Sequence, residues 1–223
     1  MVALSPAHPQ SLTAESHRVL ARLAGASFAP EVYLAGSAAL ALYLGHRPVR
    51  ELDLMSATNR LAPADRRDLL AEVLALFAGS QVETARDGYF FASLEGVGLR
   101  IHYYPYPLVE PPAEVDGLAV ASAVDLGLMK LGAIISRGTR RDFLDLYLLC
   151  RQLPLATLLD AASGKFGHVR DFTLQALKGL VDFSQVAGEP MPRLARPVTW
   201  EEVESWALAE VRSLSEAFTG AAP

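Results

Sequence analysis

Apolar and polar residues repeat with two different periods along this chain, and the balance between them changes near the middle. In the first half, short apolar runs of strand length alternate with amphipathic stretches of helical spacing. This pattern predicts helices over residues 12–25, 37–44 and 63–77, and strands over 31–35, 50–55, 81–84, 89–94, 99–104 and 118–120. Turn signals at Asp87-Gly88 and at 96–98 separate the later strands.

From residue 122 onward, apolar positions recur at helical spacing alone. The pattern predicts helices over 122–136, 140–152, 154–163, 168–179 and 199–218, the last opening with a capping box at Thr199 and Glu202. A proline-rich segment, 105–117, separates the two halves. We therefore expect an α/β (α+β) fold, with residues 1–117 forming an α/β core that includes the N-terminal helix and 118–223 forming a helical domain that completes an active-site cleft.

Composition and charge narrow the class of protein. The 223 residues are 51% hydrophobic and 20% charged, which is typical of a globular chain. A net charge of −5 argues against a protein that coats nucleic acid through excess Lys and Arg, although a local basic patch stays compatible with it. We expect no membrane span, no signal peptide and a cytoplasmic location. The single cysteine, Cys150, closes an apolar run and is expected in the core.

Two short motifs in the first half are candidates for chemistry. Glu51 and Asp53 alternate with leucines in an expected strand, so both carboxylates should project from one face, close enough to share a divalent ion. Gly36-Ser37 stands where a strand gives way to a helix, and free backbone N–H groups there suit a phosphate. Each motif has a structural alternative, as a helix cap or a solvated strand end. Together, in this order, they favour metal-assisted nucleotidyl transfer to a hydroxyl.

A second charged group lies where two expected helices meet. Lys130 and Arg137 are seven residues apart and share a helical face, and Asp142 and Asp145 share a face of the next helix. Lys130 stands inside an apolar stretch, where a solvated lysine is less expected. With Arg140-Arg141, these cations predict a local site for a triphosphate or RNA. The structural alternative is a polar joint with carboxylates at a helix N-terminus.

These residues resemble the motifs of the AbiEii/AbiGii-type nucleotidyltransferase toxins, which include the MenT-type toxins, within the polymerase-beta-like nucleotidyltransferase superfamily. The first family motif is matched by Gly36-Ser37, Ala39-Leu40, Gly45-His46-Arg47 and Glu51-Leu52-Asp53. The second is matched by Asp125, Met129-Lys130, Arg137-Gly138, Asp142-Phe143 and Asp145-Leu146. The likeness runs from about residue 33 to 211.

The resemblance implies a fold, an activity and partners. The fold would be a mixed β-sheet nucleotidyltransferase core flanked by helices, followed by a helical C-terminal domain. The activity would be transfer of a nucleoside monophosphate from an NTP to an RNA hydroxyl, such as the 3′ end of tRNA, with Mg²⁺ or Mn²⁺ as cofactor. The partners would be the NTP, the RNA acceptor and a cognate antitoxin, with no membrane.

The resemblance also implies a role for individual residues. Glu51, Asp53, Lys130 and Asp142 would be catalytic, with Glu51 and Asp53 as the metal ligands. Nucleotide binding would fall to Gly36, Ser37, Lys130 and Arg137.

Two departures from the family pattern keep other functions open. Glu51 stands where the motif has Asp, and its extra methylene moves the carboxylate that Mg²⁺ would need in near-octahedral geometry. The expected strand 99–104 offers no third carboxylate; His102 there is either a base or an ordinary strand histidine. The alternatives are a non-catalytic nucleotide- or RNA-binding module and a small-molecule nucleotidyltransferase of the antibiotic-modifying type.

Overall fold

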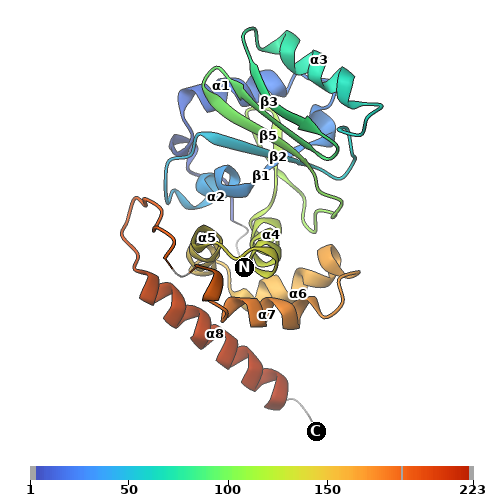
Figure 1. Cartoon of the computed structure of the whole chain (residues 1–223). Coiled ribbons are helices and arrows are strands. Elements are labelled where there is room, and N and C mark those ends of the chain that lie inside the picture. The colour runs from blue at the N-terminus through green and yellow to red at the C-terminus, as the bar shows by residue number, and fades with distance from the viewer. Residues whose placement is uncertain (1–3, 187, 221–223) are drawn as a thin grey trace. The chain divides into compact units, whose positions relative to one another are not determined.

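The computed structural model describes residues 4–186 and 188–220, and the chain divides into two units, Met1–Ser122 and Ala123–Pro223 (Figure 1). The first unit holds the sheet and the second is helical. This is the α/β core followed by a helical part that the sequence pattern predicts. Each unit is described separately below.

Seven strands of the first unit form one mixed sheet in the order β3-β4-β5-β2-β1-β7-β6. The strands are β1 (Tyr33–Ala35), β2 (Glu51–Ser56), β3 (Gln81–Arg86), β4 (Tyr89–Leu94), β5 (Val97–Tyr103), β6 (Ala113–Val115) and β7 (Leu118–Val120). The β2–β5 and β1–β7 pairs are parallel and the other pairs are antiparallel. The central strand β2 therefore has β1 on one side and β5 on the other.

Three helices of the first unit cover the sheet. They are α1 (Ala14–Leu23), α2 (Gly36–Leu44) and α3 (Arg66–Leu76), with short 3₁₀ turns at Pro9–Ser11 and Ala29–Glu31. In the view of Figure 1, α1 and α3 lie above the sheet, while α2 lies below it and packs against β1 and β2. Six of the nine residues of α2 are buried, because the helix is apolar on nearly every side. Its N-terminus is therefore held rigidly against β2.

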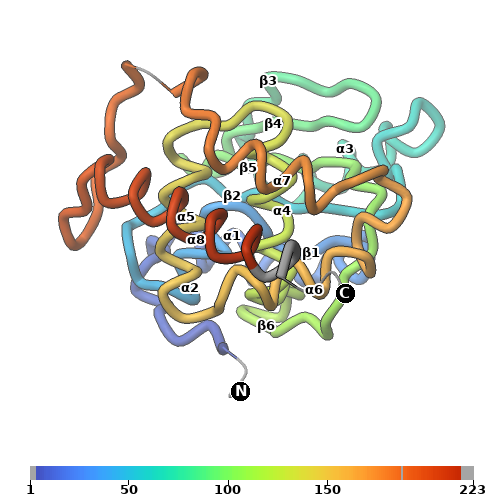
Figure 2. Tube along the Cα trace, turned by 90° about the horizontal axis from the view of Figure 1, so that it is seen from below, coloured from blue at the N-terminus to red at the C-terminus, as the bar shows by residue number. Residues whose placement is uncertain are grey.

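The second unit is built around α4, which packs against three other helices. Its elements are α4 (Ala123–Ser136), α5 (Arg140–Cys150), α6 (Leu155–Phe166), α7 (Phe172–Leu180), a 3₁₀ turn at Ser184–Val186 and α8 (Trp200–Gly220). Helix α4 contacts α5, α6 and α7, and α8 lies beside α5 (Figure 2). The expected capping box opens α8, because Glu202 accepts from the Thr199 N–H at 2.7 Å and donates its own N–H to the Thr199 hydroxyl at 3.2 Å.

The structure differs from the sequence pattern mainly around the proline-rich segment. Ala113–Val115 forms β6, which the pattern does not predict, and Leu118–Val120 pairs in parallel with β1. Both strands lie within the first unit, which extends to Ser122. Within the described residues, no helix combines the length and the apolar character needed to cross a bilayer.

Candidate functional site

The central strand β2 presents its two carboxylates on one face of the sheet. Leu52 and Leu54 are fully buried on the opposite face, as strand alternation predicts. The Glu51 side chain, at the start of the strand, is 52% exposed, whereas that of Asp53 is 22% exposed. Asp53 is therefore the more enclosed of the two oxygen donors.

The Gly-Ser motif lies directly against Asp53. Ala35 of β1 pairs with Asp53 in the antiparallel register, so the next residue, Gly36, opens α2 beside that carboxylate. Gly36 has a φ of +62°, and a Cβ at this position would lie 2.6 Å from Asp53 Oδ2. Only glycine accommodates both the left-handed backbone and this close approach. Ser37 follows in the first turn of α2, so the two motifs of the first half meet in one place.

A basic residue of the neighbouring strand joins the two carboxylates. Arg100 of β5 is in register with Asp53. Its Nη1 donates to Glu51 Oε2 at 2.8 Å and its Nη2 to Oε1 at 2.9 Å, while Nη1 lies 3.6 Å from Asp53 Oδ1. The guanidinium also stacks on Phe91 at 4.9 Å. The hydrogen bonds that Arg100 donates to Glu51, more than any other contact, raise the pKa of Arg100, so it stays charged.

His102 is the fourth member of what we call the carboxylate cluster: Glu51, Asp53, Arg100 and His102. Its Nε2 lies 3.9 Å from Asp53 Oδ1, and its ring makes an edge contact with Tyr89 at 5.1 Å. Burial raises the pKa of Asp53, but the contacts with His102 and Arg100 outweigh it and leave that pKa below its usual value. Asp53 is thus ionised at neutral pH, as a metal ligand must be.

The carboxylate oxygens of the cluster are suitable ligands for a hard divalent cation, but Arg100 already binds those of Glu51. Carboxylate oxygens are the donors that Mg²⁺ prefers, and it completes its octahedron with water and phosphate oxygens. No group of three or more His, Cys, Asp or Glu residues suited to a metal occurs in the described part of the chain, so Glu51 and Asp53 would be the protein's share. Both oxygens of Glu51 accept hydrogen bonds from Arg100, so a metal ion at Glu51 would compete with that arginine for the carboxylate charge.

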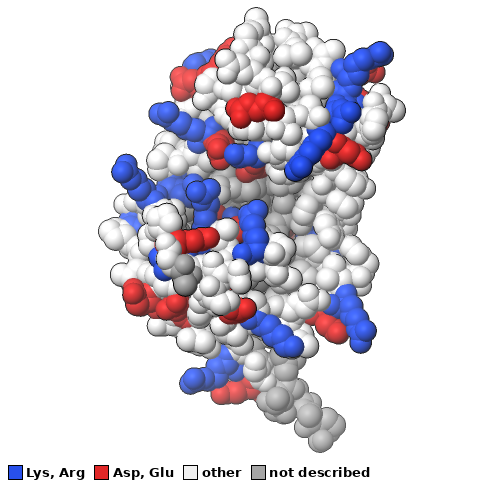
Figure 3. Space-filling view, viewed as in Figure 1, with Lys and Arg blue, Asp and Glu red and all other residues white. Residues whose placement is uncertain are grey.

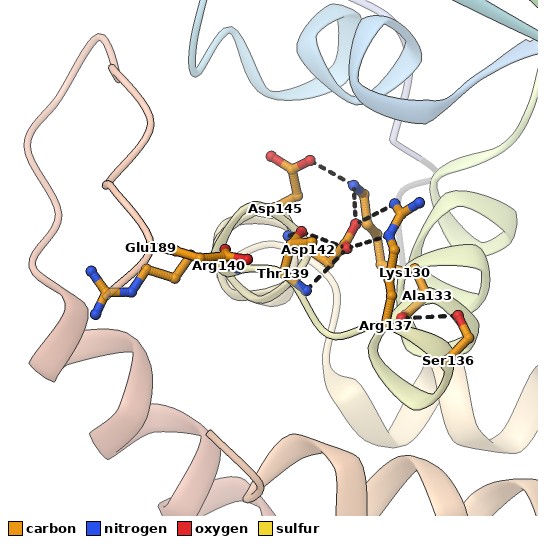
Figure 4. Close-up of polar contacts among 9 residues, drawn as sticks. All are labelled: Lys130, Ala133, Ser136, Arg137, Thr139, Arg140, Asp142, Asp145 and Glu189. Carbon is orange, nitrogen blue, oxygen red and sulfur yellow. Dashed lines mark hydrogen bonds and ion pairs between the residues drawn. The ribbon is translucent and has the colours of Figure 1, made fainter. Parts of the chain in front are cut away.

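The second unit holds a separate group of charges, which we call the lysine cluster: Lys130, Arg137, Asp142 and Asp145 (Figure 4). Lys130 Nζ, from α4, lies 3.1 Å from Asp142 Oδ1 and 2.7 Å from Asp145 Oδ2 of α5. Arg137 Nε donates to Asp142 Oδ2 at 3.0 Å. Two cations thus face two anions, and all but Arg137 are buried.

Asp142 also fixes the start of α5. Its carboxylate accepts from the Thr139 hydroxyl at 2.7 Å, and the Asp142 N–H bonds back to that hydroxyl in a capping box. Burial raises the pKa of Asp142, but the Arg137 hydrogen bonds, the Lys130 charge and the Thr139 hydroxyl together lower it to about 2. The same carboxylate therefore caps a helix and orients two cations.

Two further charged residues that the sequence analysis singles out, Arg140 and Asp125, lie apart from the lysine cluster. The Arg140 side chain points away from it and stacks on Trp200 at 4.9 Å, while its backbone N–H donates to Glu189 at 2.7 Å (Figure 4). The expected group of four cations is therefore split. Asp125 is fully buried and pairs with Lys165 Nζ of α6 at 2.8 Å.

Sequence reasoning missed Arg100 and Lys165 because both reach partners far along the chain. Arg100 alternates with Leu99 and Ile101, a signal that one face of β5 is polar. That face becomes the Asp53 face only once β5 is known to pair in parallel with β2.

Known proteins resemble this chain in sequence or in fold. A protein of Aquifex aeolicus (strain VF5), the uncharacterized protein aq_aa25, is 28% identical over 211 residues, covering 93% of this chain and 99% of its own. A Helicobacter pylori protein, provisionally described as a nucleotidyltransferase, has a similar structure with a TM-score of 0.50 and 17% identity over 92% of this chain and 98% of its own. The antibiotic-resistance factor ANT(2'')-Ia aligns with a TM-score of 0.46 and 17% identity over 67% of this chain and 89% of its own.

A family model provides the assignment. The model described as nucleotidyl transferase AbiEii toxin, type IV TA system, matches residues 18–207, which include both the carboxylate cluster and the lysine cluster. The match spans most of the chain, and the mixed sheet agrees with the Helicobacter pylori structure in fold. The chain therefore belongs to the AbiEii family of nucleotidyl transferase toxins of type IV toxin–antitoxin systems.

Proposed function

We propose that this protein transfers a nucleoside monophosphate from an NTP to a hydroxyl of RNA, with the 3′ end of tRNA as the preferred acceptor, and that Mg²⁺ or Mn²⁺ is required. The observation that carries the proposal is the placement of Asp53. Its carboxylate shares a sheet face with Glu51 and lies so close to Gly36, at the first turn of α2, that an added Cβ there would be 2.6 Å from Oδ2. A metal-binding acid and a phosphate-binding helix start are thereby adjacent.

In this proposal, the first unit holds the reacting phosphates. Asp53 is the principal protein ligand of the metal, and Glu51 is the second. Backbone N–H groups at Gly36 and Ser37 would bind phosphate oxygens, because the start of a helix carries a partial positive charge that favours anions. A bound divalent ion would neutralise charge on the transferred phosphoryl group.

Lys130 and Arg137 are proposed as triphosphate contacts, as the family resemblance implies. Lys130 is buried and held by two carboxylates, so its ammonium is already oriented before any substrate binds. The Asp142 side chain is 1% exposed and is bonded to Lys130, Arg137 and Thr139. This favours a role for Asp142 in positioning the two cations rather than in contacting the nucleotide.

The family supports a partner gene product, because its description places the toxin in a type IV toxin–antitoxin system. Toxins of toxin–antitoxin systems act on an essential cellular component, and we propose tRNA as that component and a cognate antitoxin as the counterpart. On the face drawn in Figure 3, basic and acidic side chains are interspersed, without a broad basic surface. The net charge of −5 favours an acceptor held at its end over a long duplex held along its backbone. We place the activity in the cytoplasm.

The test is label transfer. The purified protein is incubated with total tRNA, Mg²⁺ or Mn²⁺, and each NTP labelled at the α-phosphate or at the γ-phosphate, followed by a denaturing gel. We expect label on tRNA from one or more α-labelled NTPs and none from γ-labelled ones. Periodate-oxidised tRNA, which lacks the terminal diol, should accept no label. Transfer from the γ-position would contradict nucleotidyl transfer, and equal labelling of oxidised tRNA would contradict the 3′ acceptor.

A thermal-shift experiment separates an enzyme from a binding module with the same fold. An enzyme that uses a metal–nucleotide complex should gain stability from NTP and Mg²⁺ together, and little from either alone. Stabilisation by RNA or nucleotide with EDTA present, and no label transfer, would favour the binding module.

A further inference from the structure

We propose that Arg100 is an internal cation of the carboxylate cluster that exchanges partners: it competes with the divalent ion for Glu51, and it binds the triphosphate in place of Glu51 when the metal–nucleotide complex binds. The proposal rests on the proposed function, since it assigns a further triphosphate-binding residue to the same site. No family motif quoted above includes Arg100.

The first observation is the geometry of the Arg100–Glu51 contact. Two N–H groups of the guanidinium donate to the two Glu51 oxygens, at 2.8 and 2.9 Å, which is the fork arrangement that arginine forms with carboxylates and phosphates alike. A phosphate oxygen pair can therefore take the place of the Glu51 carboxylate on Arg100 without a change of hydrogen-bond pattern. The freed Glu51 oxygens would then be available to a metal ion.

The second observation is electrostatic. Nη1 of Arg100 lies 3.6 Å from Asp53 Oδ1 as well as 2.8 Å from Glu51. With one guanidinium between two carboxylates, the three groups have a net charge of −1 rather than −2. A divalent ion approaching Asp53 meets this positive charge at close range, so metal binding without a triphosphate is weakened.

The third observation identifies which partner moves. Arg100 is anchored by Phe91 beneath it, and its side chain is 25% exposed. Glu51 is at the first position of β2 and is half exposed, and its neighbour across the parallel register is Gly98. A Cβ added at Gly98 would already be in van der Waals contact with Glu51 Cγ, at 3.5 Å, so Glu51 packs over a position that carries no side chain, and its half-exposed carboxylate is the more mobile partner.

The same geometry gives a reason for glutamate at position 51. Its partner Arg100 stands two residues beyond Gly98 on β5, so the carboxylate must reach along the neighbouring strand. The extra methylene of glutamate supplies that reach. An aspartate at 51 would hold Arg100 less well and would leave its own oxygens more available to a metal.

The test measures the affinity for Mn²⁺ and the affinity for a triphosphate, because removing Arg100 should change the two in opposite directions. Binding of Mn²⁺ alone is followed by the electron paramagnetic resonance signal of free Mn²⁺, and binding of inorganic tripolyphosphate by calorimetry. We expect Arg100→Met to bind Mn²⁺ about tenfold more tightly, because a nearby positive charge is removed, and tripolyphosphate about tenfold more weakly. Arg86→Met is the matched control, because Arg86 also stacks on a sheet aromatic, Tyr89, and should change neither affinity.

Two further variants keep the outcome decisive. Glu51→Asp tests the exchange from the other partner, and it replaces Arg100→Met if circular dichroism shows that the arginine variant does not fold. We expect Glu51→Asp to tighten Mn²⁺ binding without weakening tripolyphosphate binding. Unchanged Mn²⁺ affinity in both variants, with binding abolished by Asp53→Asn, would overturn the exchange and leave the metal site intact. Unchanged Mn²⁺ affinity in Asp53→Asn would remove the metal site itself, and with it the proposed function.

Discussion

Asp53 is the residue on which the proposed chemistry depends, and its carboxylate is positioned by three neighbours. Gly36 approaches it from the start of α2, Arg100 from β5 and His102 from the same strand. The neighbours restrain its position, and the contacts with His102 and Arg100 hold its pKa below the usual value. We therefore predict that metal binding at Asp53 is sensitive to substitutions of these neighbours that are too small to alter the fold.

Gly36→Ala should displace Asp53 and weaken metal binding. The added Cβ would lie 2.6 Å from Asp53 Oδ2, in a backbone conformation with φ of +62° that costs about 1–2 kcal/mol for an L-residue. Gly79→Ala is the matched control, because Gly79 also has a positive φ, of +82°, but nothing lies within 4 Å of its added Cβ. Both variants should lower the melting temperature, and only Gly36→Ala should lower Mn²⁺ affinity. Equal Mn²⁺ affinity in the two would contradict the contact.

Cys150 should be almost inert in the folded protein. Burial, followed by the charge of Glu210, raises the pKa of its thiol to about 12, so the nucleophilic thiolate is scarce at pH 8. We expect alkylation by iodoacetamide at pH 8 to be at least about 100-fold slower in the native protein than in protein unfolded in guanidinium. Equal rates in the two states would show that the thiol is neither buried nor perturbed.

At the scale of elements, α5 begins where the lysine cluster is assembled. The Thr139–Asp142 capping box and the Lys130–Asp142 ion pair use the same carboxylate, so the start of the helix and the orientation of the cations are coupled. Helix α4 brings a second buried charge, Asp125, against Lys165 of α6. Both pairs lie between helices, so their loss should be measurable as lost stability.

Asp142 should make stability fall at low pH. Its pKa in the folded protein, about 2, is below the ordinary 3.8, so its contribution is present above about pH 3.8 and is lost as the pH falls through 3.8 to 2. The contribution at neutral pH is about 2 kcal/mol. We expect the stability difference between wild type and Asp142→Asn to shrink below pH 3.8 in urea titrations. Asp160→Asn, which removes an exposed carboxylate from α6, should show no such trend; a pH-independent Asp142→Asn difference would contradict the linkage.

Lys165→Met should be strongly destabilising. Asp125 and Lys165 are fully buried, and removing one partner of a buried ion pair costs about 3–5 kcal/mol. Asp125→Asn combined with Lys165→Met should recover much of this loss, because no lone charge stays buried. The exposed Lys178→Met on α7 is the control and should change the free energy of unfolding by less than about 0.5 kcal/mol. A Lys165→Met protein as stable as this control would show that the pair contributes little.

At the scale of the whole molecule, local patterns predicted the elements but not their pairing. Strand β4 occupies the predicted residues and β2 lies within one residue of its prediction, because alternation and turn residues are local signals. Strand β6 was missed because three residues within a proline-rich segment carry no period, and the strand order depends on contacts between distant segments.

The same distinction holds for the two clusters. Glu51 and Asp53 share a strand face because they are two residues apart in the sequence. Lys130 and Arg137 share a helix face because they are seven residues apart. Arg100 and Glu51 are 49 residues apart and Lys165 and Asp125 are 40 apart, so nothing local links them. The part that could not be predicted is the part set by strand register and helix packing.

The most direct test of the central claim is the rate of transfer of α-labelled nucleotide to tRNA by wild type, Asp53→Asn and Asp87→Asn, with folding of each checked by circular dichroism. Asp87→Asn makes the same chemical change in the turn between β3 and β4. The account predicts a loss of about 10³-fold or more for Asp53→Asn, since a metal ligand is removed, and wild-type rates for Asp87→Asn. Wild-type transfer by a folded Asp53→Asn protein would contradict the account.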